Sequence, residues 1–238
     1  MATHPTTKAD RVKGKDINGK TMTLVRTHPE QLSLFQTFLP DNETKYSNTI
    51  ELYDAVPKYF SSKHMEGKRE NGKYLPILQR EFEHKGQAYK LHIHPARIRY
   101  KKGGELEFYP SYREELVEEA LRKIACDRLN GIYLDDRAGV QFTLYELTKE
   151  LLARGHSLTQ ADLIEALKIC NLSTIAIETP DGTAIIQSTI FPTLLLSSKS
   201  DWLKNPEETR CYVQFNPLVT ASIHRLTYIT GCGFCKSS

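Results

Sequence analysis

The chain has 238 residues, of which 39% are hydrophobic and 26% charged, a composition typical of a soluble protein with one large domain or two small ones. No run of 18 apolar residues occurs, so no transmembrane helix is predicted, and the polar, basic N-terminus does not resemble a secretory signal. The five cysteines are odd in number and widely scattered, which disfavours a disulfide framework and predicts a reducing, cytoplasmic location.

Charge is divided unevenly along the chain. Residues 1–110 hold 19 Lys and Arg against 13 Asp and Glu, whereas residues 111–238 hold 13 against 16. The N-terminal half is therefore the better candidate for an anionic partner such as DNA. Its first segment, residues 1–22, is polar and basic with almost nothing to bury. We expect a flexible basic arm there, which either contacts DNA or only solubilises the chain.

Several elements are expected before residue 100. They are a helix over 29–39, a strand over 47–53, an exposed loop over 61–73, and a hairpin that pairs 78–82 with 89–93. Pro29 suits the first position of a helix, and apolar and polar residues alternate on both sides of Lys85 and Gly86, as in a hairpin. A run of basic residues follows from Arg97 to Lys102.

Residues 111–191 show the element order of a winged helix, which is a helix-turn-helix with an appended β-hairpin. The first two helices are each signalled by a capping box. In one box Ser111 precedes Glu114 by three residues, and in the other Thr143 precedes Glu146.

The remaining winged-helix elements follow in the expected order. A third helix opens at 157–160, and a β-branched, alternating strand covers 173–178. Thr-Pro-Asp-Gly-Thr at 179–183 is a turn that returns the chain as a second strand over 184–191. The sequence therefore predicts the α+β class, with a winged helix preceded by a small segment that contains a β-hairpin.

Beyond this core we expect further elements and a tail. They are a strand over 193–197, a polar linker over 198–208, a strand over 209–215, a short helix over 217–226, and an unstructured tail over 229–238.

The charges of the winged helix disfavour its use as a DNA reader. Its third helix would present Gln160, Asp162, Glu165 and Lys168, and its wing turn holds Asp181 and no cation. Phosphates would be repelled by such a surface. DNA contact is assigned instead to basic residues that precede it, namely Arg97, Arg99, Lys101 and Lys102, with Lys68, Arg69 and Lys73 as a second cluster.

The wing and the segment after it are rich in aliphatic residues. We expect Ile185, Ile186, Ile190, Leu194 and Leu196 to form a dimer interface. The alternative is that these side chains only complete the core of their own domain.

Two motifs could carry metal or redox chemistry. His92 and His94 flank one apolar residue on a strand, so their side chains project to the same side. Both imidazoles could therefore coordinate one metal ion, as in a DNA-nicking enzyme. Cys232 and Cys235 have the spacing of half a zinc site, but no second pair accompanies them. Since neither motif is complete and no nucleophile elbow occurs, we predict a protein that is not an enzyme and needs no cofactor.

The chain also resembles a known family. The resemblance lies in Ser47-Asn-Thr-Ile-Glu-Leu-Tyr-Asp-Ala-Val-Pro-Lys-Tyr59, Pro95-Ala-Arg-Ile98, Phe108-Tyr-Pro-Ser111 and Val140-Gln-Phe-Thr-Leu-Tyr145. These stretches are similar to plasmid replication initiators of the RepA type, over roughly residues 24–228.

The resemblance implies a fold and a function. Such initiators have two tandem winged helices, of which the first dimerises and contacts the DNA backbone and the second reads repeated origin sites. They have no nuclease activity, and they recruit host replication proteins. Residues 23–228 would be the first winged-helix domain, and the ten residues that follow do not match, so we expect a shortened or frame-shifted initiator.

The expected function is thus origin binding and self-association without catalysis. Two alternatives stay open: a metal-dependent nicking initiator that uses His92 and His94, and a winged-helix transcription regulator.

Overall fold

The computed structural model describes residues 11–15, 21–25, 49–60, 74–100, 104–127, 131–134, 137–197 and 209–220. Its helices are α2 (Thr49–Ala55), α3 (Tyr112–Asp127), α4 (Leu144–Ala153) and α5 (Gln160–Leu172). No helix in these ranges is long and apolar enough to span a membrane.

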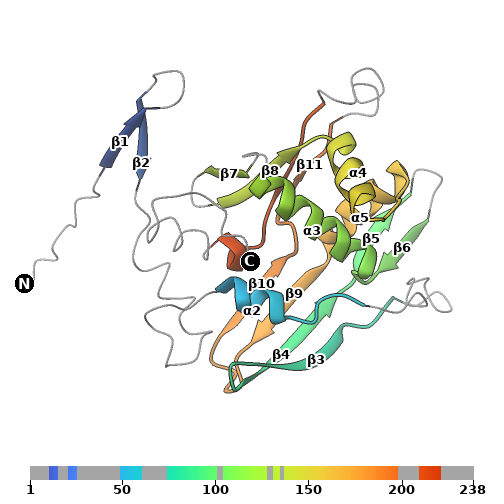
Figure 1. Ribbon diagram of the computed structural model, residues 1–238. Helices are drawn as coiled ribbons and strands as arrows, with labels where there is room; N and C mark the ends of the chain where they lie inside the picture. The colour runs from blue at the N-terminus through green and yellow to red at the C-terminus, as the bar shows by residue number, and fades with distance from the viewer. Residues whose placement is uncertain are drawn as a thin grey trace, which may run out of the picture.

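Two four-stranded antiparallel sheets contain most of the strands (Figure 1). The first sheet has the order β10-β9-β4-β3 and is built from β3 (Leu78–His84), β4 (Gln87–His94), β9 (Thr174–Glu178) and β10 (Ile185–Thr189). The second has the order β11-β12-β8-β7 and is built from β7 (Gly131–Leu134), β8 (Arg137–Phe142), β11 (Thr193–Leu195) and β12 (Cys211–Gln214). Two separate antiparallel pairs complete the fold, β1 (Arg11–Lys15) with β2 (Thr21–Val25) and β5 (Ala96–Arg99) with β6 (Glu105–Phe108).

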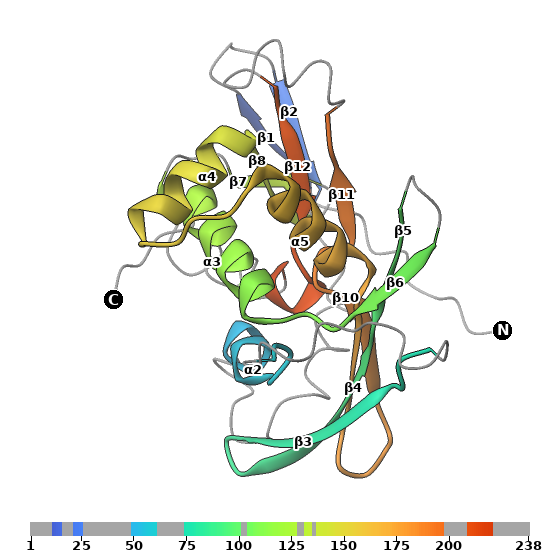
Figure 2. The same ribbon diagram turned by 90° about the vertical axis from the view of Figure 1, so that its right-hand side faces the viewer.

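The chain passes from the first sheet to the second between β10 and β11, which follow one another along the side of the molecule (Figure 2). At the crossing, Ile190 and Phe191 are fully buried. The Phe191 N–H donates to the Cys170 carbonyl at 3.1 Å, and its carbonyl accepts from Asn171 Nδ2 at 2.7 Å. The crossing is therefore fastened to the end of α5.

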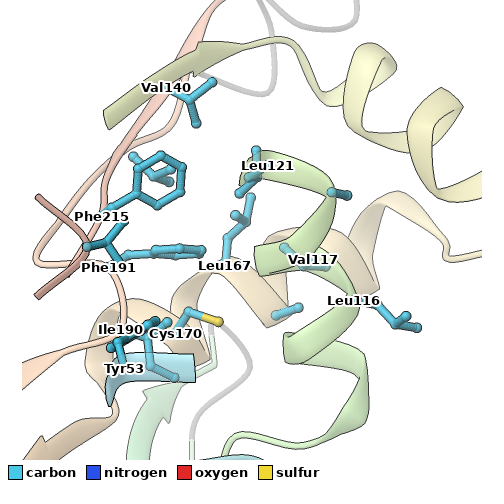
Figure 3. Packing of buried hydrophobic residues seen from close by; sticks show 14 of the residues in the cluster. Tyr53, Leu116, Val117, Leu121, Val140, Leu167, Cys170, Ile190, Phe191 and Phe215 are labelled. Atoms are coloured by element: carbon cyan, nitrogen blue, oxygen red, sulfur yellow. The ribbon is translucent and has the colours of Figure 1, made fainter. Parts of the chain in front are cut away.

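The core lies between these strands and α3 and α5. Figure 3 shows Leu121 of α3 and Leu167 of α5 turned toward Phe191 and Phe215, whose rings meet edge-on with centroids 6.3 Å apart. Each such side chain contributes about 1.5–3 kcal/mol by its removal from water. Helix α3 is the central element because it contacts α4, α5 and β8.

Local signals in the sequence predicted several elements correctly. The hairpin β3–β4 turns at Lys85 and Gly86, both with positive φ, as a tight two-residue hairpin turn requires. The Thr143–Glu146 capping box is complete, with the Glu146 N–H donating to Thr143 Oγ1 and the Thr143 N–H donating to the Glu146 carboxylate. Over residues 111–191 the helices α3, α4 and α5 and the strands β9 and β10 occur in the predicted order, and the hairpin β7–β8 lies between the first two helices.

Three expectations are corrected. The strand expected over 47–53 is wrong, because this segment belongs to helix α2. Leu52, Tyr53 and Val56 are buried at the spacing of one helical face, which outweighs the short alternation that suggested a strand. Strands β9 and β10, expected as the wing of a unit that follows the hairpin segment, instead extend the β3–β4 hairpin into one sheet. Within the expected flexible arm, Arg11–Lys15 instead forms a strand paired with Thr21–Val25.

Other expectations fall outside the described residues. They are the helix over 29–39, the loop over 61–73, the linker over 198–208 and the tail over 229–238 with Cys232 and Cys235. Of the last helix, residues 217–220 are described and are helical.

Candidate nucleic-acid interface

The hairpin β5–β6 lies beside α5 (Figures 1 and 2), and β5 contacts this helix. Ala96 and Ile98 of β5 are buried against Ile169 of α5, and Tyr100 and Phe108 pack around them. These residues form a small apolar cluster separate from the main core. Strand β5, which contains the first part of the basic segment, therefore packs against α5, the third helix of residues 111–191.

Polar contacts also hold the hairpin against α5. The Tyr100 hydroxyl donates to Glu165 Oε1, and Arg113 Nη1 donates to Glu165 Oε2 at 3.1 Å. Burial, followed by the bond to Glu165, raises the pKa of Tyr100 to about 12. Glu165 is therefore held between the hairpin and helix α3.

This arrangement corrects the expected exposure of the third helix. Lys168 is exposed as predicted, but Gln160, Asp162 and Glu165 are each only partly exposed. Asp162 caps the helix by accepting from the Thr159 N–H and hydroxyl. The hairpin covers the side of α5 that carries Ile169 and Glu165, while Ala161, Lys168 and Leu172 remain exposed beside it.

The outer face of the hairpin carries a ladder of opposite charges. In the register of β5 and β6, Arg97 lies opposite Glu107 and Arg99 lies opposite Glu105. Arg97 Nε and Nη2 both lie 2.9 Å from Glu107 Oε1, and its guanidinium stacks 3.7 Å from the centroid of the Tyr74 ring. Arg97 is thus a fixed cation whose charge is offset by a carboxylate that is 2% exposed.

Arg99 differs from Arg97 in its surroundings. It is exposed, and among the described residues no carboxylate forms an ion pair with it. Of the seven basic residues predicted to contact phosphate, Arg97 and Arg99 are described, and the structure brings them to one face of the hairpin. Lys101, Lys102, Lys68, Arg69 and Lys73 lie outside the described residues.

Strand β6 and the roles of Tyr74, Tyr100 and Glu107 were not predicted from the sequence. A signal for β6 was present, because Glu105-Leu-Glu-Phe108 alternates after Gly103 and Gly104 in the manner of Ala96–Arg99. The contacts with Tyr74 and Glu165 join residues far apart in sequence and leave no local signal.

His92 and His94 lie on the same face of β4. His92 Nε2 is 3.6 Å from Glu178 Oε2 on the neighbouring strand, whereas His94 lies opposite Thr174. In the described part of the chain, no group of three His, Cys, Asp or Glu side chains could hold a metal ion. The structure therefore pairs one of the two histidines with a carboxylate and supplies no third ligand there.

The expected dimer interface is partly wrong. Ile190 is 0% exposed and belongs to the core of its own chain, because the crossing between the two sheets turns it inward. Ile186, Leu194 and Leu196 are half-buried and pack against that core. Only Ile185 of the five is well exposed, at 60%, and Leu195, which was not predicted, is equally exposed.

Comparison with known proteins gives limited results. No protein-family model matches the chain. No curated protein matches it either. A solved structure of domains 2 and 3 of RctB aligns with 73% of this chain at 8% identity and a TM-score of 0.45, and a second structure of these domains aligns with 74% at 8% identity and a TM-score of 0.42.

The chain covers 61% and 60% of those two structures, which is less than two thirds of either. With TM-scores below 0.5 and identities of 8%, these likenesses establish neither a shared fold nor a shared function.

Proposed function

We propose that this protein is a DNA-binding replication initiator of the plasmid type that acts without catalysis and associates with itself. Its motifs resemble those of RepA-type initiators, and its elements over 111–191 follow the order of a winged helix. We propose that α5 is the third helix of that winged helix and that β9 and β10 are its wing strands.

One observation carries the assignment of the DNA contact: the basic hairpin β5–β6 packs against one side of α5. In many winged helices the third helix enters the major groove. Here the apolar contact of Ile98 with Ile169 and the bond from Tyr100 to Glu165 occupy part of that helix. Contact with DNA therefore passes to the hairpin, since a two-stranded β-ribbon can follow the backbone or enter the major groove.

The two arginines of the hairpin have different roles in this proposal. Arg97 is paired with Glu107 and stacked on Tyr74, so it shapes the hairpin. Arg99 is exposed and forms no ion pair with another described residue, so its guanidinium can bind a phosphate. Lys101 and Lys102 follow it in the sequence and would extend the same contact.

Footprinting on the parent plasmid tests the proposed function. We expect protection of repeated sites at the replication origin, together with binding to other duplexes that is weaker and depends strongly on salt. Protection confined to a promoter would indicate a transcription regulator. Cleavage of single-stranded origin DNA that His92→Ala abolishes would indicate a nicking enzyme.

A hairpin variant tests the proposed contact. Changing Arg99, Lys101 and Lys102 to Ala while keeping Arg97 removes cations without breaking the Arg97–Glu107 pair. Binding should weaken on every duplex, and its salt dependence should flatten. Unchanged binding by this variant would contradict the assignment to the hairpin.

A further inference from the structure

Strand β10 forms one edge of the first sheet. The sheet order is β10-β9-β4-β3, and among the described residues no strand pairs with the side of β10 that faces away from β9. Its first residue, Ile185, is 60% exposed. An edge of this kind presents unpaired N–H and C=O groups to the surroundings.

The register shows which backbone groups point outward. The Thr179 N–H donates to the Ala184 carbonyl at 3.0 Å, so this pair of residues is hydrogen-bonded across the hairpin. Bonded and non-bonded pairs alternate along an antiparallel ladder. Ile185 and Gln187 therefore direct their N–H and C=O groups away from β9.

A second contact agrees with this alternation and limits the open edge. Thr189 has the same parity as Gln187, and its carbonyl accepts from Asn216 Nδ2 at 2.9 Å, on the side away from β9. The next residue, Ile190, turns into the core. Two residues, Ile185 and Gln187, thus carry the outward backbone groups that the described residues leave unpaired.

The two edges of the sheet differ in charge. The opposite edge strand, β3, has Glu81 and Glu83 exposed, which is a usual way to prevent pairing with another chain. Around β10 no charged residue occurs between Asp181 and Lys199. The β10 edge therefore lacks the protection that β3 has.

We propose that the open edge of β10 pairs antiparallel with the β10 edge of a second copy of this chain, about a two-fold axis at Ile186. This inference rests on the self-association proposed above and specifies its geometry. At a two-fold axis each residue meets the same residues of the other copy, and an uncharged edge permits this without repulsion.

The position of the axis follows from the free backbone groups. With the axis at Ile186, Ile185 of one copy lies opposite Gln187 of the other, and the two pairs form four hydrogen bonds. An axis at Gln187 would instead require the Thr189 carbonyl, which Asn216 already engages. Ile186, half-buried on the core side of the sheet, then meets its own copy and extends the apolar core across the interface.

Cross-linking of the full-length chain tests the register. Residues directly opposite each other in a non-hydrogen-bonded pair lie close enough for a disulfide. Ile186→Cys should therefore give a covalent dimer under mild oxidation, above the background of the unmodified chain with its five cysteines. Leu195→Cys, equally exposed to Ile185 but placed on β11, should not exceed that background.

Sedimentation velocity of full-length variants tests the edge itself. Gln187→Pro removes an outward N–H and leaves the bonds to β9 intact, so the dimer dissociation constant should rise about tenfold or more. Ile185→Lys should act in the same direction, whereas the matched variant Leu195→Lys should leave dimerisation unchanged. Circular dichroism would confirm that each variant is folded.

The outcomes separate this inference from the proposed DNA contact. A chain that remains monomeric would overturn the inference and, with it, the proposed self-association. A dimer that resists both Gln187→Pro and Ile185→Lys, or one that cross-links at Leu195→Cys and not at Ile186→Cys, would overturn the inference and leave the self-association standing. The proposed DNA contact would stand in each case. Loss of DNA binding by the hairpin variant with dimerisation retained would overturn the DNA contact alone.

Discussion

The hydroxyl of Tyr100 donates to the carboxylate of Glu165, and this bond joins the end of β5 to the middle of α5. It holds the basic hairpin against the third helix of residues 111–191, whose charges disfavour contact with DNA. In this arrangement the helix supports the hairpin, and Arg97 and Arg99 of the hairpin face the solvent.

The Tyr100–Glu165 bond predicts a specific dependence of stability on pH. The pKa of Tyr100 is raised to about 12 in the folded chain, above its ordinary value of 10.0. Its contribution is therefore fully present below pH 10 and is lost as the pH rises toward 12. Urea unfolding of the unmodified chain and of Tyr100→Phe across this range should show a stability difference that shrinks with rising pH.

Tyr112→Phe is the control, since Tyr112 is 51% exposed and its hydroxyl forms no hydrogen bond within the described residues. Tyr112→Phe should cost less unfolding free energy than Tyr100→Phe at pH 9, where both hydroxyls are compared in the same buffer. A stability difference for Tyr100→Phe that stays constant between pH 9 and pH 12 would contradict the proposed role of the bond.

The two arginines of the hairpin should separate stability from binding. Arg97→Ala leaves Glu107, which is 2% exposed, without its cation, and we expect a loss of about 1–3 kcal/mol of unfolding free energy. Arg99→Ala should change stability by less than about 0.5 kcal/mol, because nothing in the described residues pairs with it. Unfolding by guanidinium chloride measures the free energy of unfolding of both variants. Equal losses would show that the Arg97–Glu107 pair does not stabilise the fold.

A buried ion pair joins Lys58, in the segment that follows α2, to Glu118 of α3. Lys58 Nζ lies 3.9 Å from Glu118 Oε2 and 3.1 Å from the Tyr53 carbonyl oxygen, and both charged side chains are at most 5% exposed. Lys58→Met should lower stability by about 3–5 kcal/mol, because it leaves the Glu118 charge buried without a cation.

The double variant Lys58→Met with Glu118→Gln should lose clearly less than the sum of the single losses, since neither charge then remains alone. Lys123→Met, which breaks a more exposed contact with Glu150, should cost less than about 1 kcal/mol. Strict additivity of the two core changes would rule out the pair as a coupled unit.

Gly139 of β8 permits a close approach to β12. A Cβ at this position would lie 2.5 Å from the Val213 carbonyl oxygen and 2.5 Å from the Tyr212 hydroxyl oxygen. Gly139→Ala should therefore lower the unfolding free energy by about 1–3 kcal/mol or more. At Gly155 an added Cβ would meet no atom within 4 Å, so only the positive φ of this residue disfavours a side chain. Gly155→Ala should therefore lower the unfolding free energy by about 1 kcal/mol, which measures backbone strain without steric overlap. Thermal unfolding compares the two, and a smaller loss at Gly139 would contradict the steric account.

Elements with local chemical signals were predictable from the sequence. The positive-φ turn at Lys85 and Gly86 and the reciprocal bonds of Thr143 and Glu146 depend on residues within a few positions of one another. Helix α2 was not predictable in the same way, because its seven residues are too short for a decisive period and the burial of Leu52 and Tyr53 in the core decides its structure.

The arrangement of the candidate site depends on contacts between distant residues. Nothing near Arg97 in the sequence indicates that Tyr74 stacks on it, and nothing near Glu165 indicates Tyr100. In the same way Ile190 has the composition of an interface residue, and only the crossing between the two sheets shows that it is buried.

The salt dependence of DNA binding tests the central claim, contact through the hairpin, most directly. The affinity of the unmodified chain for one origin duplex would be measured over a range of salt concentrations, beside Arg99→Ala and Arg137→Ala, a second exposed strand arginine on β8. If Arg99 neutralises one phosphate, Arg99→Ala should lower the magnitude of the slope of log K against log salt by about 0.9, and Arg137→Ala should leave it unchanged. Equal slopes for all three proteins would contradict the claim.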